Sequence, residues 1–426
     1  MQNEPEKSSG PPILTAKTFP IYVTFFAWGL GTGSLQLARP LFAFKVTGDI
    51  FLVSFLVGSS SVARIIAGPL TGYLTDRWGR KPLVIAGAAL RGLTTLGQFY
   101  TESYLPFFIL EFIGQMGVSM WTTSTGVLVG DVTTPENRGR VMAVRTMSSR
   151  IGFVAGPAIA GALAVTLGLR YVFLFSTLTK LINLGVMFWI SESRPEEARQ
   201  RAQKKQEEED AEKKPSLLAS LFLTKTFIAL ALVTFGLSMM QMGVFQTLVP
   251  VHTQEEVGLN EFEIGNLVSF ASIIALIVAF PNGMVSDRFG RKASLVPGML
   301  VLGGSAILLA ISGNYLGIVL MMLLYGIAEG MVQGSTQVYA VDLAPADRRG
   351  TVVGVWSIFM SLGGMVTTLL VATLYTAFGA MIAFNGVAGF LIASALVLAF
   401  MAKETAGRRR LAGPSSETPP PSPETT

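Results

Sequence analysis

Long apolar runs alternate with short polar segments along almost the whole chain. A helix needs about 20 apolar residues to cross the hydrocarbon core of a bilayer, and about twelve runs reach that length. They lie approximately at residues 19–44, 51–74, 83–102, 105–130, 141–167, 171–191, 218–250, 262–285, 293–313, 315–341, 351–378 and 382–402. The pattern predicts an all-α membrane protein with about twelve transmembrane helices.

One polar segment is much longer than the others and divides the chain near its middle. Residues 192–217 are densely charged, which is typical of a solvated linker rather than of a binding element. We therefore expect six-helix bundles at residues 19–191 and 218–402. The N-terminal tail, 1–18, is polar and does not have the pattern of a signal peptide. The C-terminal tail, 403–426, is rich in Pro, Ser and Glu, a composition that favours disorder.

Lysine and arginine collect in the loops on one side of the predicted helices. The loops around residues 77–81, 138–145, 288–292 and 348–349 are basic. The loops on the other side carry few cations, and the one at residues 255–263 is acidic. Short cytoplasmic loops are enriched in Lys and Arg, so the pattern predicts that both termini and the linker lie in the cytoplasm.

A charged sequence between the second and third runs occurs again between the eighth and ninth. The two copies read GYLTDRWGRK (72–81) and GMVSDRFGRK (283–292). Asp76 and Asp287 are 211 residues apart, as are Asp131 and Asp342. The halves therefore run in the same direction, and we expect two pseudo-symmetric bundles. Transporters built from parallel halves bind their substrate between the halves, near the middle of the membrane.

Composition narrows the class of protein. Half of the residues are hydrophobic and only 14% are charged, against roughly 25% charged in an average soluble domain. The net charge of +5 does not indicate nucleic-acid binding, because the basic residues fall in short, separate clusters. The sequence has no cysteine and a single histidine, His252. It also lacks a Ser/His/Asp set and a phosphate-binding loop, so we expect no metal, no cofactor and no enzyme activity.

These repeated motifs resemble those of the major facilitator superfamily over nearly all of residues 19–402. The loops DVTTPENRGR (131–140) and DLAPADRRG (342–350), and the half-ends SESRPEE and KETAGR, are also similar to family motifs. The resemblance implies alternating access, a small-molecule substrate, a monomer in the lipid bilayer of the plasma or inner membrane, and a cavity lined by spans one, four, seven and ten. It further implies that the charged loops latch the outward-open state. The latch residues are Gly72, Asp76, Arg77, Gly79, Arg80, Lys81, Asp131 and Arg138 in the first half, and Gly283, Asp287, Arg288, Gly290, Arg291, Lys292, Asp342 and Arg349 in the second.

Span five carries a narrower resemblance. The sequence GFVAGPAIAG contains Gly152, Gly156, Pro157 and Gly161 in the pattern of drug–proton antiporters, with alanine in place of the first closing glycine. The resemblance implies protons as the coupling ion. The alternative is ordinary helix packing, because small residues at this spacing let a neighbouring backbone approach closely.

Two carboxyl groups lie inside predicted spans. Glu329 is 14 residues from Tyr315 and 13 from Asp342, which places it roughly 20 Å from either end of span ten at 1.5 Å per residue. Glu111 in span four is nearer the outer surface and stands where many family members have an arginine. Burial in an apolar medium favours the protonated carboxyl group, so both are proton-coupling candidates. The alternative for each is a structural ion pair or hydrogen bond.

Cations also occur within the spans. Arg64, Arg91, Arg150 and Lys180 fall on helices that the resemblance places away from the cavity wall, so we expect structural roles for them. Arg39 lies near the outer end of span one, where it either snorkels to the membrane surface or faces the cavity.

The predicted lining helices supply polar and aromatic cavity candidates among many methionines, which suit adaptable apolar walls. For at least half of these residues the alternative is bundle packing or lipid contact. The cavity candidates are Trp28, Gln36, Arg39, Gln115, Trp121, Gln241, Phe245, Gln246 and Gln333.

The sequence thus favours a secondary transporter that exports small amphipathic or drug-like molecules in exchange for protons. The alternative is a proton-coupled uptake carrier for a sugar or an organic anion. A membrane sensor or membrane-embedded enzyme is disfavoured, because no catalytic constellation occurs in the sequence.

Overall fold

The computed structural model describes residues 14–15, 18–132, 137–188, 224–344, 349–402 and 404. The predicted linker at 192–217, and all but a few residues of the two tails, lie outside this part of the chain. The first half forms α1 (Phe19–Thr47), α2 (Ile50–Trp78), α3 (Arg80–Tyr100), α4 (Tyr104–Val132), α5 (Arg138–Thr166) and α6 (Tyr171–Met187). The second half forms α9 (Lys225–Ser238), η1 (Met239–Leu248), α10 (Val249–Glu255), α11 (Glu261–Phe289), α12 (Arg291–Ile311), α13 (Tyr315–Leu343) and α14 (Arg349–Met401).

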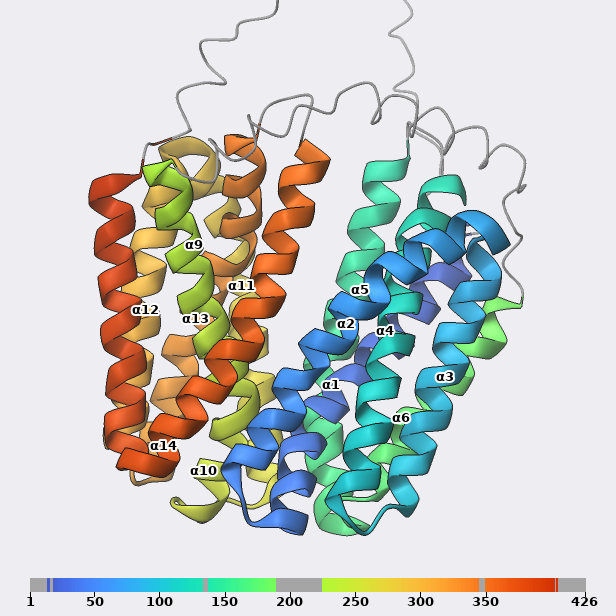
Figure 1. The fold of residues 1–426 in the computed structure, drawn as a ribbon, viewed down its shortest axis with the longest axis horizontal. Helices are drawn as coiled ribbons and strands as arrows, with labels where there is room; N and C mark the ends of the chain where they lie inside the picture. The colour runs from blue at the N-terminus through green and yellow to red at the C-terminus, as the bar shows by residue number, and fades with distance from the viewer. Residues whose placement is uncertain are drawn as a thin grey trace, which may run out of the picture.

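The helices form two bundles, α1–α6 and α9–α14 (Figure 1). In the second bundle α9, η1 and α10 follow one another without a break, and η1 is a π-helix. The helix α14 contains non-helical backbone at Gly379 (φ 82°, ψ 169°), so it consists of two successive helices. Each bundle therefore has six helical segments within the described residues, which confirms the predicted all-α architecture.

The helix ends follow from local sequence. Asp49 caps α2 by accepting a hydrogen bond from the Phe51 amide at 2.7 Å, and Asn260 forms a capping box with Glu263 at the start of α11. Single glycines separate α2 from α3 and α11 from α12: Gly79 has φ 92° and Gly290 has φ 102°. Only glycine adopts this backbone readily, and these two residues are equivalent in the sequence repeat. The repeat therefore encodes the same tight turn twice.

The outer surface of the bundles is apolar. Seven helical segments of the described residues are long and apolar enough to cross a membrane, the last of them spanning the break in α14. Large side chains on these segments are highly exposed, among them Ile277 (62%), Phe280 (79%) and Phe400 (85%). Such exposure is unfavourable in water and is the ordinary condition of a helix face in lipid.

Within the described residues, the two bundles contact each other toward one end. We call the end with Gly79 and Gly290 the basic end, and the other end the far end. Near the far end, the backbone of α5 lies directly against that of α11. An added Cβ at Gly161 would collide with the backbone of Glu261 and Phe262, and one at Gly265 with that of Pro157. The bundles converge near α10 and diverge toward the basic end (Figure 1).

Candidate functional site

A cavity of about 460 Å³ lies between the bundles, a size within the usual range for small-molecule sites. A second cavity of about 240 Å³ adjoins it and extends to Asp287 and Arg291 at the basic end. The larger cavity is lined by residues of α1, α4 and α5 on one side and of η1, α11 and α13 on the other: Phe25, Trp28, Gly29, Thr32, Trp121, Thr122, Thr125, Arg145, Thr146, Ser149, Arg150, Phe153, Val154, Gln241, Ser272, Ala275, Leu276, Glu329 and Gln333.

Three aromatic side chains form the wall on the first bundle. Trp28 and Trp121 stack with their ring centroids 3.8 Å apart and their planes 5° from parallel, and Phe25 lies 4.9 Å from Trp121. The indole N–H of Trp121 donates to Asn183 Oδ1 at 3.1 Å. Behind the wall, Lys180 Nζ lies 4.2 Å from the Trp28 ring centroid. All three side chains are buried, with 2 to 5% of their surface exposed. The wall is therefore apolar and held in place from behind.

Arg145 on α5 projects beside this wall. Its guanidinium carbon lies 4.2 Å from the centroid of the Phe25 ring. The Nε atom is buried without a hydrogen-bond partner, and Nη1 contacts only the weakly accepting sulfur of Met142 at 3.3 Å. Among the described residues no carboxylate pairs with Arg145. The cavity thus has a cationic group beside its aromatic wall with unused donor capacity.

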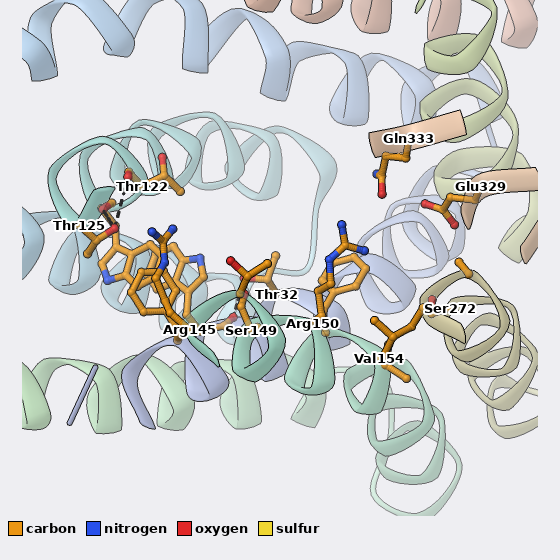
Figure 2. A pocket seen from close by; sticks show the side chains of 18 of the residues that line it. Thr32, Thr122, Thr125, Arg145, Ser149, Arg150, Val154, Ser272, Glu329 and Gln333 are labelled. Carbon is orange, nitrogen blue, oxygen red and sulfur yellow. Dashed lines mark hydrogen bonds between the residues drawn. The ribbon is translucent and has the colours of Figure 1, made fainter. Parts of the chain in front are cut away.

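Glu329 on α13 lies on the opposite wall of the cavity. Its Oε1 accepts a hydrogen bond from Gln241 of η1 at 3.2 Å, and the hydroxyl of Tyr325, one turn earlier, also interacts with it. Figure 2 shows Arg150 of α5 pointing across the cavity toward Glu329 and Gln333. The wide π-helical turn that carries Gln241 is of a kind often found at functional sites. The cation and the neutral donors favour the ionised carboxylate, whereas burial favours the protonated carboxyl group, so the two effects oppose each other at this position.

Glu111, the other proton-coupling candidate, lies outside the cavity. It is fully buried within the first bundle, where Oε1 pairs with Arg39 at 2.7 Å and Oε2 pairs with Arg91 at 3.1 Å. Gln98 and Gln115 also donate to it, at 3.0 and 2.7 Å. These contacts favour the structural alternative for Glu111, because protonation would leave the buried Arg91 and the partly buried Arg39 without their counterion.

The structure brings together only part of the predicted cavity set. Trp28, Trp121, Gln241, Gln333 and Glu329 line the cavity. The other candidates do not: Arg39 and Gln115 belong to the Glu111 cluster, Phe245 stacks on Tyr325 at 3.9 Å, and Gln36 and Gln246 are absent from the lining. Position on a predicted lining helix therefore did not identify the cavity residues by itself, because only one face of each helix lines the cavity.

The expectation that Arg150 lies away from the cavity is wrong. Because α5 contacts α11 only near the far end, its other half faces the opening between the bundles and presents Arg145, Ser149 and Arg150 there. Arg145 also lines the cavity and was not among the residues predicted from the sequence to do so. The sequence pattern that could have indicated this is the helical spacing of Arg145, Ser149 and Gly152, which lie on one face of α5. Arg64, Arg91 and Lys180 are outside the cavity lining, as expected.

The span-five glycines mediate two kinds of close approach. Added Cβ atoms at Gly152 and Gly156 would collide with the backbone of α1, at Phe26 and Ser34 among other residues. Beyond Pro157 the contacts pass to α11 of the second bundle, where the amide of Ala158 donates to Ser269 Oγ at 3.0 Å. The motif thus joins α5 to α1 within one bundle and to α11 across the interface.

The repeated charged loop forms a compact cluster in the second half. Arg291 pairs with Asp287 at 2.8 Å and with Asp342 at 2.9 Å. The carboxylate of Glu404 accepts hydrogen bonds from the amides of Arg291 and Lys292 at 2.8 and 3.2 Å. This cluster ties α11, α12 and α13 together within one bundle and coexists with a cavity that reaches the basic end.

In the first half, only part of the predicted latch lies within the described residues. Arg77 donates to the Tyr73 hydroxyl at 3.3 Å, and Lys81 to the Phe188 carbonyl at 3.4 Å. The side chains of Asp76, Asp131 and Arg138, and of Arg349 in the second half, are outside the described set. The role of these loops in an outward-open state stays a prediction.

Two parallel six-helix bundles around a central cavity are the architecture of a membrane transporter that binds its substrate between its halves. The sequence matches the family model "Major Facilitator Superfamily" over residues 21–251 and 230–424. The chain therefore belongs to the major facilitator superfamily, and it is a multi-pass membrane transporter of small molecules.

Relatives of known name fall into different substrate groups. The chain is 23% identical to Multidrug resistance protein 2 of Bacillus subtilis (strain 168), over 81% of this chain and 84% of that protein. It is 23% identical to the Cis,cis-muconate transport protein of Acinetobacter baylyi, over 70% and 73%. The crystal structure of a D-xylose-proton symporter superposes with a TM-score of 0.74 at 18% identity, covering 92% of this chain and 98% of that one. That likeness concerns the fold alone.

Proposed function

We propose that this chain exports small amphipathic molecules from the cytoplasm in exchange for protons, with the cavity between the bundles as its binding site. The observation that carries the proposal is Glu329, a carboxyl group in the middle of a long apolar helix that lines this cavity. Intramembrane carboxyl groups are costly and typically mark proton or ion pathways. The aromatic wall supplies the apolar contact, and a relative named as a multi-drug resistance efflux pump supports export.

The orientation follows from the basic loops. Lys and Arg favour the cytoplasmic side, so the basic end and both termini face the cytoplasm, and the described conformation is open inward. We retain 19–191 and 218–402 as the bundle limits. The transporter acts as a monomer in the cell membrane, with the charged loops stabilising the outward-open state.

Glu329 carries the proton in this proposal. When it is ionised, its charge is balanced by Arg150 across the cavity and by the hydrogen bond from Gln241. When it is protonated, Arg150 is left without that counter-charge. Loss and gain of one proton therefore change the net charge of the binding site by one unit, which lets substrate binding and proton binding influence each other.

A transport assay with an imposed pH gradient tests the direction of coupling. Purified protein is reconstituted into vesicles, and accumulation of permanently charged probes is measured, namely ethidium and naphthalene-2-sulfonate. An antiporter accumulates its substrate on the acidic side of the membrane, whichever way the protein is inserted. Equal accumulation in vesicles without protein, or with no gradient, would contradict coupled transport.

A second candidate function is proton-coupled uptake of an organic anion. Arg145 and Arg150 favour it, because two arginines and one carboxylate line the cavity among the described residues. A symporter accumulates its substrate on the alkaline side of the membrane. The same vesicle experiment therefore separates the two candidates by whether the probe accumulates on the acidic or the alkaline side.

A further inference from the structure

We propose that the cavity recognises an organic anion with a planar apolar body, and that Arg145 is the residue that binds the anionic group. This inference rests on the proposed function in one respect, since it takes the cavity between the bundles as the transport site. It holds for either direction of transport.

Charge is distributed unevenly along the cavity. Its one acidic lining residue within the described chain, Glu329, belongs to the second bundle and faces Arg150 (Figure 2). Arg145 lies at the other end, where Figure 2 shows it beside Thr122 and Thr125, away from Glu329. A ligand cation would therefore meet unbalanced positive charge at this end, whereas a ligand anion would balance it.

Arg145 makes few of the hydrogen bonds that its guanidinium could donate. Its Nε is buried and has no hydrogen-bond partner, while contact with Phe25 holds the guanidinium over the aromatic wall. A buried donor without a partner is unfavourable, and a guanidinium matches the two oxygens of a carboxylate or sulfonate in a fork. An anion in the cavity beside this guanidinium would balance its charge.

The neighbouring hydroxyl groups do not compete with Arg145 for the ligand. Thr125 donates to the Trp121 carbonyl at 2.6 Å, and Thr122 donates to the Val118 carbonyl at 2.9 Å. Because these donors are occupied within their own helix, Arg145 is the strong anion contact at this end of the cavity.

Binding of three probes with the same aromatic body tests the inference. They are naphthalene-2-sulfonate, the neutral naphthalene-2-sulfonamide, and the cation (naphthalen-2-ylmethyl)trimethylammonium, each titrated calorimetrically into the full-length protein in lipid nanodiscs. We expect the sulfonate to bind at least about 10-fold more tightly than the sulfonamide, because a hydrogen-bonded charge contributes about a 10- to 100-fold gain in affinity.

Substitutions then assign the anion contact. Arg145→Gln should weaken sulfonate binding by about 10- to 100-fold and leave sulfonamide binding within about 3-fold of the wild type. Arg145→Lys, which keeps the charge but loses the fork, should fall between them. The matched control is Arg140→Gln, which removes the same charge from an exposed position of α5 outside the cavity lining and should change neither affinity.

Three results would overturn the inference: equal affinity for sulfonate and sulfonamide, tighter binding of the ammonium probe, or unchanged sulfonate binding by Arg145→Gln. Each variant is also titrated with the neutral sulfonamide, and binding of this probe shows that the cavity of the variant is folded. Because these titrations need neither a gradient nor transport, failure of the substrate class is distinct from failure of proton-coupled transport, which the vesicle experiment measures.

Discussion

The contact between α5 and α11 at the far end predicts that a single methyl group will shift the conformational equilibrium. Gly265 of α11 lies against Pro157 and Gly161 of α5 in the conformation described here, which we propose is the inward-open one. The outward-open form required by alternating access must separate these helices. Gly265→Ala should therefore penalise the inward-open form and leave the outward-open form nearly unaffected.

The size of the effect follows from the geometry. The added Cβ would lie 3.1 Å from the carbonyl carbon of Pro157 and 3.2 Å from Cα of Gly161, and closer still to the Pro157 oxygen. All three atoms are backbone, so relief requires the helices to move apart. Overpacking of this kind costs about 1–3 kcal/mol, which corresponds to about a 5- to 150-fold shift toward the outward-open form.

Spin-label distances can measure this shift, because the chain has no native cysteine. One cysteine pair, at Thr166 and Glu255, reports the separation of the bundles at the far end. A second pair, at Arg140 and Arg288, reports it at the basic end; all four positions are exposed. Gly265→Ala should lengthen the first distance and shorten the second.

The control is Gly304→Ala on α12, where an added Cβ would meet nothing within 4 Å. It makes the same change in helix propensity without the collision and should leave both distance distributions unchanged. Unaltered distance distributions in Gly265→Ala would contradict the predicted collision between α11 and α5, as would a shift of equal size in Gly304→Ala.

Three further predictions concern other parts of the molecule. Glu111→Gln should lower the thermal unfolding midpoint in detergent markedly, since removing one partner of a buried ion pair costs about 3–5 kcal/mol; an unchanged midpoint would contradict the structural role of the cluster. Trp121→Ala should weaken naphthalene-2-sulfonate and naphthalene-2-sulfonamide binding by similar factors, because both share the aromatic body, and a selective loss of the sulfonate would contradict this. Arg291→Ala removes the side chain that links Asp287 to Asp342 and should alter the spin-label distances at the basic end; distances identical to the wild type would show that this charge cluster does not bias the equilibrium between the two open forms.

The architecture was predictable because it depends on signals that are local or repeated. Apolar runs of bilayer length gave the helices, and the repeated loops gave two halves. The turns at Gly79 and Gly290 show why the repeat was informative, since both glycines take the same positive-φ conformation. The break at Gly379 likewise separates two runs that the hydropathy pattern had already distinguished.

The site was predictable only in part because its residues depend on helix rotation and on contacts between distant segments. The partners of Glu111 come from three helices, and Arg39 is 72 residues away in sequence. No local pattern announces such a cluster. Arg150 was misjudged for a related reason: its helix packs against the other bundle at one end and faces the cavity at the other, and one sequence pattern cannot distinguish these environments.

The most direct test of the account is substrate-dependent proton movement by Glu329→Gln. Wild-type protein and the variant are reconstituted into vesicles that contain a pH-sensitive dye, and protons are followed after addition of a transported probe. Glu256→Gln, an exposed position outside the cavity, serves as the control. We expect Glu329→Gln still to exchange labelled for unlabelled probe but to move no protons, whereas the control moves protons like the wild type. Proton movement of wild-type size in Glu329→Gln would contradict the assignment of Glu329 as the proton carrier.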